Sequence, residues 1–171
     1  MQHGYSELRR IRILLIAFII GLVASGITAF PIETELNWLL SLAGVGPDVK
    51  ADRFTGLLNW LVTVRNGVAA TNKAFPFLAY GTDWLAYAHL VIAIAFIGPV
   101  LDPIRNKWVI TFGLIACVSV VPLALIAGAV RGIPLYWRCI DCMFGVVGFA
   151  VLWPCQLLIR RLDEKASSRR I

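Results

Sequence analysis

The feature that most constrains this chain is a set of four apolar stretches, each close to the roughly 20 residues that a helix needs to cross a bilayer. They cover about residues 11–30, 84–101, 108–130 and 139–159. With 59% hydrophobic and only 15% charged residues, the 171-residue chain has too few polar side chains to cover a soluble globule. The sequence therefore predicts an all-α fold, a polytopic four-transmembrane-helix bundle that forms a single integral membrane domain over residues 1–171.

Basic residues cluster before the first stretch, between the second and third, and after the fourth. The residues of these clusters are His3, Arg9, Arg10, Arg12, Arg105, Lys107, Arg160, Arg161, Lys165, Arg169 and Arg170. Because cytoplasmic loops are enriched in Lys and Arg, these segments and both termini are predicted to be cytoplasmic. The net charge of +6 then reflects topology, and nucleic acid is not an expected partner.

The segment after the first stretch, residues 31–82, is the one long loop, and its charges are balanced, so it can be translocated. Two runs in it have apolar residues at helical spacing: Leu36, Leu39, Leu40 and Ala43, and then Phe54, Leu57, Leu58, Leu61 and Val64. Asp52 is placed to cap the second run. We expect two short amphipathic helices that lie at the outer membrane interface, with Trp38 and Trp60 at headgroup level.

Small residues mark where the spans are expected to touch. Gly21 and Ser25 in the first stretch, and Gly145 and Gly148 in the fourth, let neighbouring backbones approach closely. We therefore predict that these positions face other helices.

Six ionisable residues map to the predicted outer ends of the spans: Glu33, Glu35, Asp83, Arg131, Arg138 and Asp141. Such groups are costly at membrane depth and usually pair or face a cavity. Arg138 and Asp141 are three positions apart and are expected to share a helix face, while Arg131 is placed to reach Asp83 or Glu33. Two interpretations follow: a charge network that joins the span ends, or a polar ligand site.

His89 lies inside the second span. An intramembrane histidine can ligate a haem or chlorophyll, relay protons, or form a hydrogen bond across helices. Asp83 is six positions away, which at about 100° per residue places the two side chains on different helix faces. No catalytic pair, metal site or cofactor is assigned from the sequence.

Cys139-Ile140-Asp141-Cys142 is a Cys-x-x-Cys motif at the start of the fourth span, where a helix N-terminus favours thiolates. Its location resembles that of the active motif in vitamin K epoxide reductase-like enzymes, which are four-helix membrane proteins. That resemblance implies a quinone-linked thiol oxidoreductase that uses Cys139 and Cys142. The shuttle cysteines of that family lie in the loop after the first span, and residues 31–82 contain no cysteine.

Residues 80–150 resemble the VanZ-like class of small bacterial membrane proteins. The similar features are Asp83 and His89 at the start of one span, followed by Arg138, Asp141 and regularly spaced small residues. The Asp-to-His spacing is longer than in that class, and Gly145 stands where an asparagine is expected. The resemblance implies an envelope-associated protein of a bacterial inner membrane and identifies no reaction.

Taken together, the patterns favour a small non-enzymatic membrane protein. Its expected partners are the lipid bilayer and either other membrane subunits, as an accessory subunit of a larger complex, or an amphiphilic envelope ligand. The ligand-binding interpretation uses Glu33, Glu35, Asp83, His89, Arg131, Arg138 and Asp141. The thiol oxidoreductase is the enzymatic alternative.

Overall fold

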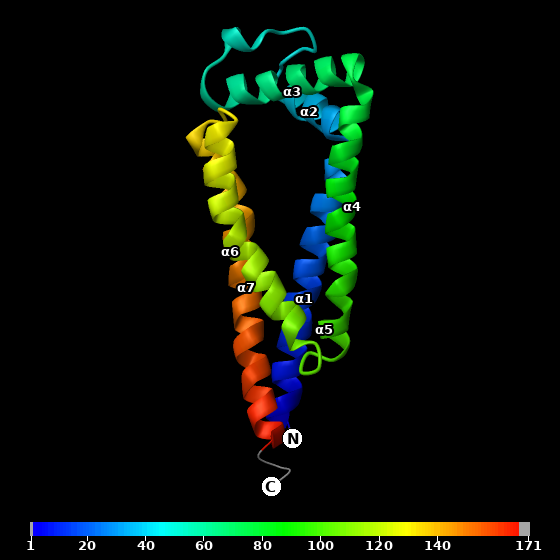
Figure 1. Cartoon of the computed structure of the whole chain (residues 1–171), viewed down its shortest axis with the longest axis vertical. Coiled ribbons are helices and arrows are strands. Elements are labelled where there is room, and N and C mark those ends of the chain that lie inside the picture. Colours follow the sequence, from blue (N-terminus) through cyan, green and yellow to red (C-terminus); the bar gives the residue numbers. More distant parts are fainter. Residues whose placement is uncertain (1, 168–171) are drawn as a thin grey trace. The chain divides into compact units, whose positions relative to one another are not determined.

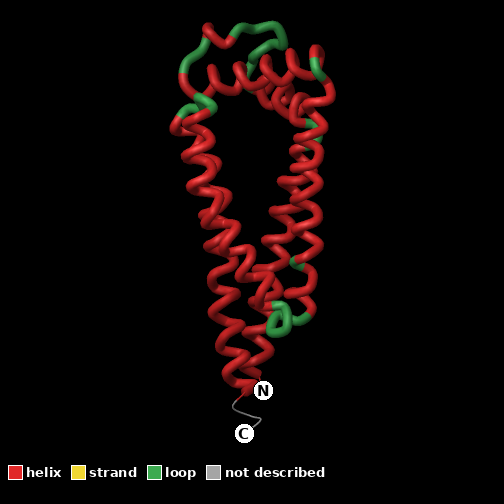
Figure 2. The backbone as a smooth tube through the Cα atoms, in the orientation of Figure 1, coloured by secondary structure: helices red, strands yellow, loops and turns green. Residues whose placement is uncertain are grey.

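The computed structural model describes the backbone of residues 2–167 and the side chains of residues 5–164. Within this range the chain forms helices, turns and short loops without a β-strand, which confirms the all-α prediction (Figure 2). The helices are α1 (Gln2–Ala29), α2 (Ile32–Leu42), η1 (Ala51–Arg53), α3 (Gly56–Ala74), η2 (Pro76–Leu78), α4 (Ala79–Ala95), α5 (Ile97–Leu101), α6 (Lys107–Val130) and α7 (Leu135–Ser167) (Figure 1). The side chains of His3, Lys165, Arg169 and Arg170 lie outside the described residues.

Four helical segments are long and apolar enough to cross a membrane. They are Tyr5–Ala29, Pro76–Leu101, Lys107–Val130 and Leu135–Glu164. The four predicted spans are thereby confirmed as helices, and the chain has the character of an integral membrane protein. The first, second and fourth helical segments are longer than the predicted apolar stretches, because a helix continues through polar residues after the apolar run has ended.

The described residues fall into two compact units. One contains the chain up to Gly21 and from Ile92 onward, and we call it the hairpin unit. The other is Leu22–Val91, called here the loop unit. The division passes through α1 and α4, so each of these helices contributes to both units.

In the hairpin unit, α6 and α7 lie side by side as an antiparallel pair (Figure 1). The turn between them is tight: Gly132 has a φ of +68°, and the Ile133 amide donates to the Gly128 carbonyl over 2.9 Å. A left-handed glycine just after a helix satisfies its last carbonyls and ends it. Gly145 and Gly148 then lie against the Cys117 backbone and sulfur, as predicted for close helix contacts.

A second cluster in the hairpin unit joins α1 to α7. Ile11, Leu15 and Ile159 are buried with Cys155, whose thiol lies 4.0 Å from the Ile11 carbonyl. Gly21 has no atom within 4 Å of a Cβ placed on it, so the predicted close approach at that residue is wrong. Gly21 lies on a face of α1 that no other part of the described chain approaches within this distance.

In the loop unit, α2 and α3 pack on a small apolar core of Leu40, Val45 and Val62. The two predicted loop helices therefore exist. The predicted cap is wrong, because Asp52 lies in η1 and α3 begins only after Thr55.

One arginine holds this core together. Arg65 is 3% exposed and donates to the carbonyls of Gly46 and Val49 over 3.0 and 3.3 Å. It also donates from Nε to Asn66, which itself bonds to the Val49 carbonyl. Buried charged groups require such partners, so Arg65 fixes the loop between α2 and η1 on α3.

Candidate functional site

Arg138 lies where the α6–α7 turn enters α7. The Pro134 carbonyl accepts from the amides of Trp137 and Arg138 over 3.0 and 3.1 Å, which starts the helix at this point. The Arg138 side chain then runs back across α6, with its Cδ over Gly128. Its Nη1 donates to the Leu125 carbonyl over 3.2 Å. A cation is favourable here because the C-terminal end of α6 has a negative dipole end.

The guanidinium group of Arg138 is not fully satisfied. Its Nε atom is buried and has no hydrogen-bond partner among the described residues. A charged donor that loses water without gaining an acceptor costs free energy, about 1–3 kcal/mol or more. The position therefore favours an acceptor supplied by water or by a bound molecule.

Asp141 lies one turn further along α7 and is half-buried. The predicted ion pair between Arg138 and Asp141 does not form. Among the described side chains, the ion pair of the hairpin unit is the one between Lys107 and Asp163, at 3.0 Å. The reason is the direction of Arg138, which follows the groove opened by Gly128 instead of its own helix face. This leaves a cation and a carboxylate near each other without mutual neutralisation.

Arg131 is exposed at the C-terminal end of α6, on the same turn that carries Arg138 into α7. The structure thus brings Arg131, Arg138 and Asp141 to one end of the hairpin unit. Contact of Arg131 with Asp83 or Glu33 would join the two units, and it stays a prediction.

The three predicted acidic site residues of the loop unit, Glu33, Glu35 and Asp83, lie on α2 and α4. Glu33 of α2 accepts a 2.6 Å hydrogen bond from Asn72 of α3, a partner that the sequence did not indicate. Glu35 and Asp83 are half-buried on α2 and α4. Glu33 therefore has a structural role in joining α2 to α3.

His89 packs where α4 meets the upper part of α1. A Cβ built on Gly26 would lie 3.2 Å from the His89 Cβ and 2.9 Å from the Ala86 carbonyl, so the two backbones approach closely. Nδ1 of His89 donates to the Leu85 carbonyl over 2.8 Å. The hydrogen bond thus lies within α4 instead of crossing to another helix.

The Cys-x-x-Cys pair occupies the first turns of α7 as free thiols. Cys139 is exposed, whereas Cys142 is half-buried with its sulfur 3.9 Å from the Val121 carbonyl of α6. Only Cys139 is openly accessible.

Among the described residues, no group of three His, Cys, Asp or Glu side chains is arranged to hold a metal ion. No protein-family model matches the chain, and neither a curated protein nor a solved structure matches it.

Proposed function

We propose that this chain is a small non-enzymatic integral membrane protein that binds an amphiphilic ligand of the cell envelope. The head group would lie at the end of the hairpin unit that carries Arg131, Arg138 and Asp141. The observation that carries this proposal is the buried, unpartnered Nε of Arg138. An acidic head group supplies the missing acceptor, and charge-assisted hydrogen bonds of this kind are among the strong ones.

Asp141 narrows the chemistry of the ligand. Because this half-buried carboxylate has no cation paired with it among the described side chains, a ligand that brings only negative charge would be repelled. A head group with an acidic oxygen for Arg138 and a hydroxyl or ammonium donor for Asp141 satisfies both residues. The apolar part of the ligand would then extend along the lipid-facing side of the spans.

The wider predicted layer is part of the proposal. Glu33, Glu35, Asp83 and His89 belong to the loop unit, and their part in a polar ligand site stays a prediction. The topology is proposed with both termini cytoplasmic in a bacterial inner membrane, and the VanZ-like resemblance favours the same envelope-associated role.

An accessory-subunit role is the second candidate. Large apolar side chains on α6 and α7 are widely exposed, for example Ile126 at 66%, Phe144 at 67% and Val147 at 56%. In a membrane protein such a surface contacts lipid or the helices of another subunit. Copurification of stoichiometric membrane proteins would favour this candidate.

The thiol oxidoreductase remains the enzymatic alternative, and the exposure of Cys139 favours it. The half-buried Cys142, bonded weakly to α6, would have to exchange electrons through Cys139.

The proposal is tested by mass spectrometry of amphiphiles that copurify with the protein in mild detergent. Wild type should retain, above the background of bulk lipid, an acidic amphiphile that also carries a hydroxyl or ammonium group, and Arg138→Gln should lower its amount. Arg105→Gln removes the same charge from the exposed α5–α6 link and should retain it. Equal profiles for wild type and Arg138→Gln would contradict the proposal.

A further inference from the structure

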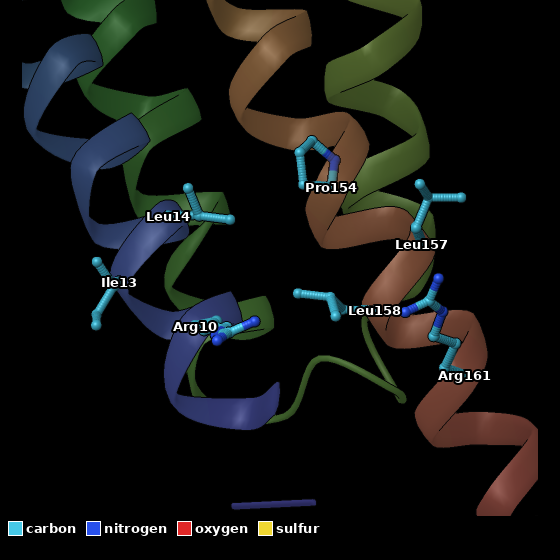
Figure 3. A pocket seen from close by; sticks show the side chains of 7 residues that line it. All are labelled: Arg10, Ile13, Leu14, Pro154, Leu157, Leu158 and Arg161. Atoms are coloured by element: carbon cyan, nitrogen blue, oxygen red, sulfur yellow. The ribbon is translucent and has the colours of Figure 1, made fainter. Parts of the chain in front are cut away.

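A second site lies at the other end of α7, where it faces the first half of α1. The groove between them has a volume of about 480 Å³. Figure 3 shows Leu14 of α1 and Leu158 of α7 directed toward the space between the two helices, with Pro154 above. Ile13 and Leu157 complete an entirely apolar wall. A peptide backbone would find no hydrogen-bond partners on such a wall, whereas a hydrocarbon chain needs none.

Two arginines line the same groove at its polar end. Arg10 lies one turn before Leu14 on α1, and Arg161 lies three residues after Leu158 on α7 (Figure 3). Because the two helices are antiparallel here, both guanidinium groups belong to the end of the unit where α1 begins. Neither has a hydrogen bond or an ion pair with any residue that the structure describes.

Neighbouring cations are already engaged. Arg12 donates from Nε to the Val100 carbonyl over 3.1 Å, and Lys107 pairs with Asp163. Arg10 and Arg161 thus differ from these neighbours in having both free donors and an apolar groove beside them.

We infer that this groove binds one anionic phospholipid, with an acyl chain against the apolar wall and the phosphate held by Arg10 and Arg161. Guanidinium groups match phosphate oxygens in a forked geometry, and basic pockets between membrane helices bind anionic head groups. A zwitterionic lipid brings a cation to the same arginines, so it is disfavoured. The lipid would tie the first span to the last one.

This site is independent of the proposed function. Arg138 and Arg161 are 23 positions apart on α7, which is about 35 Å along a helix. Loss of one site should therefore leave the other intact, and Arg138→Gln should not alter phospholipid binding at the groove.

Native mass spectrometry of the full chain in detergent tests this inference, with dioleoyl phosphatidylglycerol and dioleoyl phosphatidylcholine as probes. Wild type should bind phosphatidylglycerol about tenfold more tightly than phosphatidylcholine. In an Arg138→Gln background, which removes the head-group site of the proposed function, the double variant Arg10→Gln/Arg161→Gln should lose this preference. The matched variant Arg9→Gln/Arg160→Gln removes the same charge from adjacent exposed positions and should keep it.

Two further arms separate the acyl chain from the phosphate. Leu158→Trp fills the groove without changing charge and should weaken phosphatidylglycerol binding while circular dichroism shows an unchanged helix content. Inorganic phosphate at the same concentration should not compete. Equal loss in both double variants, effective competition by inorganic phosphate, or binding unaffected by Leu158→Trp would overturn the inference.

Discussion

Arg138 of α7 lies across Gly128 of α6, and its side chain occupies the space that a Cβ atom at residue 128 would need. Gly128 lies four residues before Gly132, the left-handed glycine in the turn between α6 and α7. The end of α6, the turn that follows it and the Arg138 side chain thus pack together at one end of the hairpin unit. The close approach also explains why Arg138 reaches the Leu125 carbonyl instead of Asp141.

Gly128→Ala should therefore destabilise the protein by about 1–3 kcal/mol, the usual cost of overpacking. Gly21→Ala is the matched control, because it adds the same methyl group to an apolar helix where nothing lies within 4 Å. That control should be neutral or slightly stabilising, since alanine favours a helix over glycine. Unfolding in detergent measures both, and shortening the long side chain in Gly128→Ala/Arg138→Ala should recover part of the loss. Equal effects of the two single substitutions would contradict the contact.

A second prediction concerns charge. Since Arg138 and Asp141 form no ion pair, Arg138→Gln and Asp141→Asn should change stability additively, within about 0.5 kcal/mol in the double variant. A double-mutant cycle in ligand-free detergent measures this directly. A coupling energy well above that value would show that Arg138 and Asp141 interact, as the sequence spacing indicates.

The spans could be predicted from sequence because a bilayer fixes both their length and their apolar character. The sequence does not predict which small residues contact another helix, because those contacts depend on how each helix is rotated about its axis. Gly26 approaches α4 closely whereas Gly21 faces open space, although both lie in the same apolar run. The direction of the Arg138 side chain cannot be predicted for the same reason. This side chain occupies the space left free by Gly128 on α6, which is a different helix.

Two other features of the structure show what sequence spacing leaves out. In the sequence, Arg10 and Arg161 indicate topology alone, although each also borders the groove between α1 and α7. Leu14 lies four residues after Arg10, and Leu158 lies three residues before Arg161. An arginine one helical turn from a leucine on each of the two spans is the sequence signal that could indicate a lipid contact. In the loop, the apolar pattern predicts both helices, but nothing in the sequence identifies Arg65 as the buried residue that holds the loop on α3.

Arg65→Leu should loosen the loop unit. Its charged hydrogen bonds to Gly46 and Val49 are each worth about 1.5–3 kcal/mol, and their loss leaves carbonyls unpaired. Amide hydrogen exchange over residues 44–54 should rise at least tenfold. Arg53→Leu, which removes the same charge at an exposed position, should leave exchange nearly unchanged. Similar protection in both variants would exclude a clamping role.

The proposed topology has a direct chemical check. Lys50 and Arg105 are both exposed, and the first lies in the loop unit while the second lies in the α5–α6 link. In a Cys139→Ser/Cys142→Ser background, Lys50→Cys should react with an impermeant maleimide in intact cells. Arg105→Cys should react only after permeabilisation, because the basic clusters favour the cytoplasmic side. The reverse pattern would invert the topology.

The last prediction separates the binding role from thiol redox chemistry. Cys139 is exposed and Cys142 half-buried, yet residues 31–82 provide no cysteine to carry electrons between this pair and a substrate. Cys139→Ser/Cys142→Ser should therefore keep the wild-type thermal stability and the amphiphile that depends on Arg138. Thiol trapping of wild-type membranes at defined quinone redox states provides the complementary measurement. A Cys139–Cys142 disulfide that forms and disappears with the quinone pool would show a working electron-transfer couple, and the enzymatic alternative would then replace the binding role.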